Sequence, residues 1–189
     1  YLLPRGLGGL EGGVLLAPSE GGAVANGVAK VVSVRLGYAA KEFGVSAATA
    51  STENGLTTVG KFKDNAIGGN YAAGPVKLTA AWRQFKYNTA KQTNMIFGVS
   101  APFGVHEIKA SLNRVNMEGS VSAANIGAND ASQIGLGYIY NLSKGTALYT
   151  TASRISNKGA ATFVVPGGVA GIAGGKTSSG YEGGVRHLF

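Results

Sequence analysis

The feature that most constrains this chain is a period-two alternation of side-chain character that recurs along nearly its whole length. Residues 32–38 read VSVRLGY, residues 76–83 read VKLTAAWR, residues 94–101 read NMIFGVSA and residues 133–140 read QIGLGYIY. Successive side chains of an extended chain point to opposite faces, so each segment predicts a strand. One face of each strand is apolar, and the other carries small, polar or basic groups.

The connections between these segments alternate in length, and this alternation predicts how the strands are joined. Short joins with turn-forming or polar residues fall at 5–9, 40–42, 74–75, 101–104 and 143–145. Longer polar joins fall at 19–29, 53–57, 88–92, 117–130 and 158–178. An up-and-down barrel of the outer membrane has short periplasmic turns and longer external loops. The pattern predicts ten antiparallel strands after the first turn, with the C-terminus on the periplasmic side.

A soluble β-sandwich would show the same alternation, so composition has to separate the two architectures. Charged residues make up 14% of the chain, there are 31 glycines, and mean hydropathy is only +0.11. No run approaches the roughly 18 apolar residues of a membrane-spanning helix. The apolar faces use modest residues, and aromatic residues stand near strand ends, at Tyr38, Phe43, Tyr71, Trp82 and Phe103. We therefore predict an all-β, antiparallel up-and-down transmembrane β-barrel and keep the sandwich as the alternative.

No residue pattern predicts an enzyme, a metal site or a cofactor. The chain has no cysteine, and its two histidines, His106 and His187, lack metal-ligand spacing and a catalytic triad context. The glycines at 167–168 and 174–175 lack a phosphate-binding pattern, so residues 158–178 are predicted to form a flexible external loop. The net charge of +8 comes from singly spaced basic residues, which argues against nucleic-acid binding.

Five basic residues share the face opposite the apolar one: Arg35, Lys77, Arg83, Lys109 and Arg186. They form either a solvated wall or a pore lining whose fixed positive charge concentrates anions. Glu11 and Glu182 are further candidates for this face, where they would weaken the preference. We take the five basic residues as candidate pore-lining residues.

The chain ends within an extended segment that carries Tyr181, Val185 and Phe189 on one face. A terminal Phe in register with an apolar face resembles the closing strand of a bacterial outer-membrane barrel, where it is part of the signal read by the barrel-assembly machinery. This resemblance makes the three residues a candidate assembly signal.

Longer segments are similar to general porins of β-proteobacteria. The likeness is carried by residues 132–144 (SQIGLGYIYNLSK), 146–149 (TALY), 154–159 (RISNKG), 67–71 (IGGNY) and 98–102 (GVSAP), together with the closing 184–189. Such porins are sixteen-stranded homotrimers of the outer membrane that let small hydrophilic solutes diffuse. The resemblance implies that residues 1–189 form a single domain, the last ten strands of the barrel, and that six strands with the constriction loop and much of the basic ladder are absent. Ten strands would leave two unpaired edges in lipid.

Three functions remain open from the sequence. The first is a passive diffusion porin with anion preference, embedded in outer-membrane lipid. The second is an outer-membrane barrel that serves as an anchor or adhesin through its long external loops. The third is a soluble β-sandwich that binds acidic partners.

Overall fold

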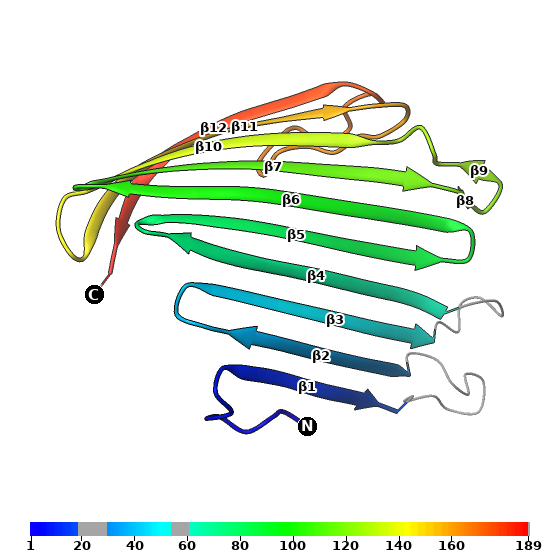
Figure 1. Cartoon of the computed structure of the whole chain (residues 1–189). Coiled ribbons are helices and arrows are strands. Elements are labelled where there is room, and N and C mark those ends of the chain that lie inside the picture. Colours follow the sequence, from blue (N-terminus) through cyan, green and yellow to red (C-terminus); the bar gives the residue numbers. More distant parts are fainter. Residues whose placement is uncertain (19–29, 54–60, 189) are drawn as a thin grey trace.

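The computed structural model describes residues 1–18, 30–53 and 61–188, and these form one antiparallel ten-stranded sheet (Figure 1). The order along the sheet is β1-β2-β3-β4-β5-β6-β7-β10-β11-β12, so neighbours in the chain are neighbours in the sheet. Only the short β8–β9 hairpin stands apart from this order. The strands are β1 (Leu10–Ala17), β2 (Val31–Ala39), β3 (Phe43–Glu53), β4 (Lys61–Ala73), β5 (Val76–Tyr87), β6 (Ala90–Phe103), β7 (His106–Glu118), β8 (Ser120–Val121), β9 (Ala124–Asn125), β10 (Ala131–Asn141), β11 (Thr146–Asn157) and β12 (Thr177–His187).

The predicted all-β, up-and-down fold is confirmed. The described ranges contain no helix, and every strand pair is antiparallel. The described residues therefore include no helix that could cross a membrane. The sandwich alternative is wrong, because the ten strands make one sheet and the described residues supply no second large sheet to cover its apolar face.

The register assigns every residue to one of two faces, because directly paired residues point the same way. The row Lys77–Ser100–Lys109–Gly137–Thr151–Glu182 crosses six strands on one face. The adjacent row Leu78–Val99–Ala110–Leu136–Ala152–Tyr181 crosses the same strands on the other face. The sheet curves around the first of these faces, which we call the concave wall, and the second is the outward face (Figure 1).

The short turns follow from residues that adopt a left-handed backbone. Gly74 and Gly104 both have φ near +61°, and each starts a two-residue connection. The predicted longer join at 88–92 is wrong. Asn88 has φ +50°, which asparagine tolerates better than most residues, so β5 and β6 are joined by Asn88 and Thr89 alone.

Other predicted boundaries shift by a few residues. The join predicted at 101–104 shortens to Gly104 and Val105, and the one at 117–130 begins after Glu118 and contains the β8–β9 hairpin. The join at 19–29 and most of the one at 53–57 lie outside the described residues. Trp82 is the seventh of twelve residues in β5, so its predicted place near a strand end is wrong.

Candidate functional site

The concave wall is built from alternate residues of the ten strands, and small and polar residues make up most of it, with apolar side chains such as Ile96, Ile139 and Ile155 among them. All five basic residues predicted to share a face lie on it. Arg35 and Arg83 belong to one cross-strand row, with Ala48 and Ala66 between them. Three strand spacings separate these two arginines, or about 14 Å. Lys77 and Lys109 share the third row from there toward the short turns, where only Ser100 lies between them.

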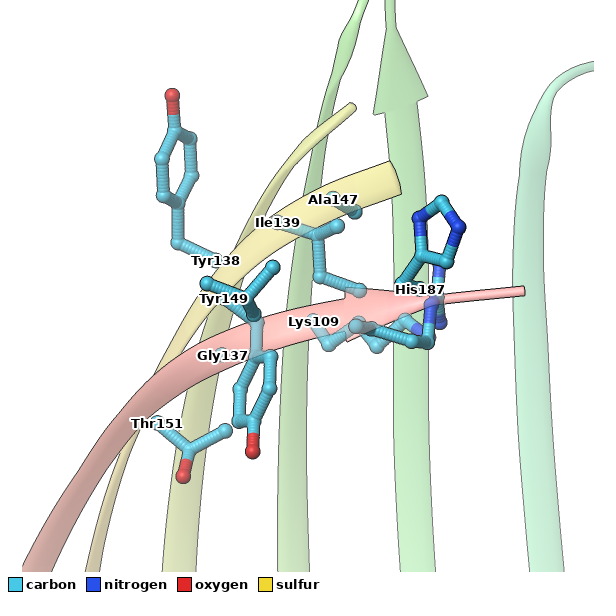
Figure 2. Close-up of a pocket in the computed structure, with 10 residues that line it drawn as sticks. Lys109, Gly137, Tyr138, Ile139, Ala147, Tyr149, Thr151 and His187 are labelled. Carbon is cyan, nitrogen blue, oxygen red and sulfur yellow. The ribbon is translucent and has the colours of Figure 1, made fainter. Parts of the chain in front are cut away.

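Two shallow hollows mark the part of the wall formed by β5–β12. The larger, of about 600 Å³, is lined by Lys109, Tyr149, Thr151 and Arg186 among others (Figure 2). The second, of about 410 Å³, is lined by alternate polar and glycine residues from Lys77 on β5 to Ser153 on β11. Lys109 borders both. The structure therefore brings Lys77, Lys109 and Arg186 to one stretch of surface, while Arg35 lies strands away.

Acidic side chains on the same wall pair with three of the five basic residues. Arg83 donates two hydrogen bonds to Asp64, from Nε to Oδ1 at 2.9 Å and from a terminal nitrogen to Oδ2 at 2.6 Å. Arg35 lies 3.4 Å from Glu11, and Lys109 lies 3.4 Å from Glu107. Within the described part of the chain, Lys77 and Arg186 have no ion-pair partner.

The wall is therefore far less basic than the composition suggests. Its strand positions hold five basic side chains and four acidic ones, Glu11, Asp64, Glu107 and Glu182. The outward positions of the strands hold six basic side chains, Lys61, Lys63, Lys86, Lys91, Arg114 and Arg154, against only Glu53 and Glu118. Most of the positive excess carried by the strands thus lies on the outward face.

Hydrogen bonds hold the acidic wall residues in place. The Ser100 hydroxyl donates to Glu107 at 2.5 Å, and Lys109 flanks the same carboxylate.

Tyr149 lies against Gly184, where an added Cβ atom would come within 2.8–2.9 Å of the tyrosine ring and hydroxyl. A side chain at position 184 would displace this tyrosine. Gly184 thus leaves room for a large polar ring on the wall of the larger hollow.

The connection at 158–176 packs against the concave wall, so the prediction that this loop is flexible is wrong. Val165 is only 4% exposed and packs with Ala131 and Ile155, both wall residues. The Asn157 side chain donates to the carbonyls of Phe163 and Lys176 and accepts from the Phe163 amide. The Val165 amide donates to the Ser178 hydroxyl at 3.2 Å. Val165 thus joins this segment to a small apolar cluster that the glycine content did not predict.

The two histidines occupy outward positions near the short turns, and His187 also borders the larger hollow. His106 stacks on Phe103 and Tyr140 and lies 2.7 Å from the Tyr138 hydroxyl, and His187 lies 2.8 Å from the Thr146 hydroxyl. The described residues contain no group of three or more side chains able to hold a metal ion. The candidate assembly residues Tyr181 and Val185 share the outward face of β12, and Phe189 lies outside the described residues.

The model of the family described as "Gram-negative porin" matches residues 1–160. The chain belongs to this family. A curated relative, outer membrane porin protein 32 of Delftia acidovorans, is 31% identical to this porin over 166 residues, which are 81% of this chain and 45% of the relative. This porin therefore spans about half the length of the curated relative that it matches.

Solved structures agree with the family and the fold. An anion-selective porin from Comamonas acidovorans superposes with a TM-score of 0.80 at 27% identity, over 100% of this porin and 58% of that chain. A porin refined at 1.8 Å resolution has a TM-score of 0.69 at 11% identity, over 98% of this porin and 60% of that chain, and shows the fold alone. Porins of this family are outer-membrane β-barrels and act as channels rather than enzymes. This porin is therefore located in the outer membrane of Gram-negative bacteria.

Sequence reasoning missed the acidic partners Asp64 and Glu107 and the tyrosine Tyr149. Asp64 and Arg83 are 19 residues apart, so only the strand register brings them together. Their positions on alternate residues of predicted strands were a usable signal for a shared face, but not for a shared contact.

Proposed function

We propose that this chain forms part of the wall of a larger closed barrel, a passive diffusion channel for small hydrophilic solutes with a preference for anions. The observation that carries the proposal is the difference between the two faces of the sheet. Across ten strands of a family member, the concave wall is mainly small and polar, and the outward face away from the external strand ends is mainly apolar. Water wets one such face while lipid covers the other, and the two edges of the sheet need further strands in lipid.

The anion preference is supported by charge and by a relative. The structural relative at 27% identity is an anion-selective porin. Among the described residues Lys77 forms no ion pair, and Arg186 forms none within 4 Å, although its charge acts on Glu107. Fixed charge beside a low-dielectric wall concentrates ions of the opposite sign. Because five basic residues face four acidic ones, we expect this wall to contribute a modest part of the preference.

Charge-neutral and charge-removing variants of the wall test this proposal. The experiment measures the reversal potential of the assembled porin in a planar bilayer across a salt gradient at low ionic strength. Lys77→Gln removes an unpaired charge and should shift selectivity toward cations. The double variant Asp64→Asn with Arg83→Gln removes one charge of each sign and should leave selectivity near that of the parent. The shift should fade at 1 M salt, where the screening length is about 3 Å.

A cation-selective parent would contradict the proposal. So would a Lys77→Gln porin with the parent's reversal potential at low salt. In either case Arg35, Lys77, Arg83, Lys109 and Arg186 would be a solvated wall and no more.

We further propose that the porin is a homotrimer and that Tyr181, Val185 and Phe189 are read by the barrel-assembly machinery. Tyr181 and Val185 are 88% and 65% exposed, which leaves an apolar strip of β12 available to a partner. Deletion of Phe189 should lower the amount of assembled oligomer, while Phe189→Tyr should preserve it because the terminal ring remains. Equal assembly of parent and deletion would refute the role of Phe189.

No adhesin function is proposed. That hypothesis used residues 158–178 as the contact surface, and the apolar side chains there pack against the concave wall.

A further inference from the structure

Two phenylalanines stand on the concave wall, near the start of β4 and the end of β5. Phe85 pairs directly with Asp64, and Phe62 lies two residues before Asp64, so both rings belong to the wall face. The rings stack with their centroids 5.7 Å apart and their planes inclined by 27°. The charge preference of the wall does not explain an aromatic pair on a face that meets water.

Arg83 is held between this aromatic pair and Asp64. Its guanidinium carbon lies 4.5 Å from the centre of the Phe85 ring. Two of its five N–H donors bind the two oxygens of the Asp64 carboxylate, and the others remain for a ligand. The Arg83 side chain is 54% exposed, so these donors are accessible. The pair carries no net charge, and it places fixed hydrogen-bonding groups beside apolar rings.

A third hollow of the wall, of about 340 Å³, lies beside this pair on β5, β6 and β7. That volume is at the lower end of the range for small-ligand pockets. Its wall residues are Arg83, Phe85, Asn94, Ile96, Asn113 and Val115. The two hollows described above contain Lys77, Lys109 or Arg186, whereas the only charged wall residue that lines this one, among the described residues, is Arg83, which is neutralised by Asp64.

Two amides of this hollow keep hydrogen-bonding atoms for a ligand. The Asn94 side-chain oxygen accepts from Gln92 at 2.9 Å, and its amide nitrogen has no partner among the described residues. The Asn113 amide nitrogen donates to Gln133 at 3.4 Å, and its side-chain oxygen has no partner among the same residues. The hollow therefore offers a donor and an acceptor in addition to Arg83.

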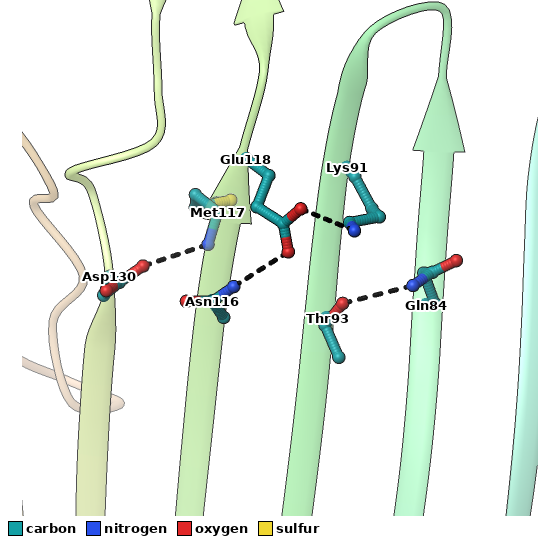
Figure 3. A network of polar contacts seen from close by, with 7 residues as sticks. All are labelled: Gln84, Lys91, Thr93, Asn116, Met117, Glu118 and Asp130. Atoms are coloured by element: carbon teal, nitrogen blue, oxygen red, sulfur yellow. Dashed lines mark hydrogen bonds and ion pairs between the residues drawn. The ribbon is translucent and has the colours of Figure 1, made fainter.

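Contacts on the outward face hold the strands of the hollow together. Gln84 of β5 donates to the Thr93 hydroxyl of β6 at 3.3 Å (Figure 3). Lys91 of β6 forms an ion pair with Glu118 of β7 (Figure 3). These contacts join the three strands that line the hollow, in addition to the backbone ladder. A preformed site lowers the entropic cost of binding a small ligand.

The unpaired basic charge of the wall lies at a distance from this hollow. Along β5, Arg83 and Lys77 are six residues apart, or about 20 Å. Along β7, Asn113 and Lys109 are four residues apart, or about 13 Å. Both distances exceed the screening length of about 8 Å at physiological ionic strength. An anion therefore gains little here, and a neutral ligand is favoured.

We propose that this hollow binds a neutral sugar in its pyranose form as the solute passes along the wall. A pyranose ring has C–H groups on its faces and hydroxyl groups around its edge. Phe85 and Ile96 contact the C–H groups, while Arg83, Asn94 and Asn113 bind the hydroxyls. This proposal rests on the proposed function, because the solute reaches the wall through the open channel. It adds a class of solute that the charge of the wall does not select.

The test measures the ion current through the assembled porin in a planar bilayer while glucose is added. Sorbitol, an acyclic polyol of similar size, is the control for viscosity, and glucuronate adds a carboxylate to the same ring. Asn94→Ala with Asn113→Ala removes the two amides of the hollow, and Phe85→Leu removes the ring. Asn65→Ala with Asn116→Ala is the matched control, because it removes two amides from outward positions of β4 and β7.

Glucose should reduce the parent's current in a saturable way, and sorbitol should not. The half-saturating glucose concentration should rise about tenfold in the Asn94→Ala/Asn113→Ala variant, as expected for the loss of two hydrogen bonds. Phe85→Leu should also weaken the block, and the matched control should behave as the parent does.

Equal block in parent and hollow variants, or equal weakening in the matched control, would overturn the proposal. Block by sorbitol as strong as by glucose would show that no ring is recognised, and block by glucuronate alone would identify an anion site. Both results also overturn it. The reversal potential of the same bilayers tests the proposed function separately. A parent that keeps its anion preference but is not blocked by glucose therefore overturns the sugar site alone.

Discussion

The concave wall and the outward ends of β4 and β5 use basic residues in opposite ways. On the wall, Arg35, Arg83 and Lys109 each have an acidic partner, and the net excess of positive charge is small. At the outward ends of β4 and β5, Lys63 and Lys86 are adjacent and form no ion pair within the described residues. The comparison teaches that the net charge of +8 does not measure the charge of the channel lining. Where a charge faces, and what lies beside it, decides what it does.

The largest expected effect comes from placing charge on the apolar part of the outward face. Leu136 is 57% exposed and stands mid-strand in β10, so Leu136→Arg would put a cation into lipid. Such a charge near the bilayer midplane costs about 2–4 kcal/mol. Gly137→Arg is the control, because a Cβ atom there meets Thr151 at 3.6 Å and Lys109 at 3.7 Å, which are ordinary contacts on the wall. Urea titration of assembled porin should separate the variants, and equal midpoints would show that the faces are misassigned.

The packed connection at 158–176 should respond next. Val165→Asp would place a carboxylate in the apolar cluster with Ala131 and Ile155, and lose the roughly 1.5–3 kcal/mol that burying a valine contributes. We expect limited proteolysis to cleave within residues 158–176 much faster in this variant. Val169→Asp lies in the same segment at 81% exposure and should be cleaved as slowly as the parent. Equal cleavage of both variants would mean that the segment is not held to the wall.

The smallest effects come from removing one acid on each side. Glu107→Gln should raise anion preference by freeing Lys109 on the wall. Glu118→Gln frees Lys91 on the outward face and should leave the reversal potential unchanged. Reversal potentials of both variants test this difference. An equal shift in both variants would mean that charge on the outward face also sets selectivity.

Sequence periodicity predicted the strand count, the antiparallel order and the facing of Arg35, Lys77 and Leu136, because the side-chain period of a strand is two. Periodicity did not predict the ion pairs. Arg83 and Asp64 are 19 residues apart in the sequence, and their contact depends on the register between two neighbouring strands. The two-residue turn at Asn88 was missed because a left-handed asparagine is a local option that polar composition does not reveal. The packed connection at 158–176 was missed because its valines are few among many glycines.

Cysteine accessibility tests the central claim, that the concave wall faces an aqueous channel and the opposite face lies in lipid, most directly. Residues 1–189 contain no cysteine, so a single thiol introduced among them reports one position. Ser111 on the wall and Leu112 on the outward face are adjacent in β7. The measurement applies a charged, water-soluble thiosulfonate to the porin in a planar bilayer. Ser111→Cys should be modified with a stepwise fall in conductance, and Leu112→Cys should stay unmodified with steady conductance. Modification of Leu112→Cys with Ser111→Cys protected would contradict the account.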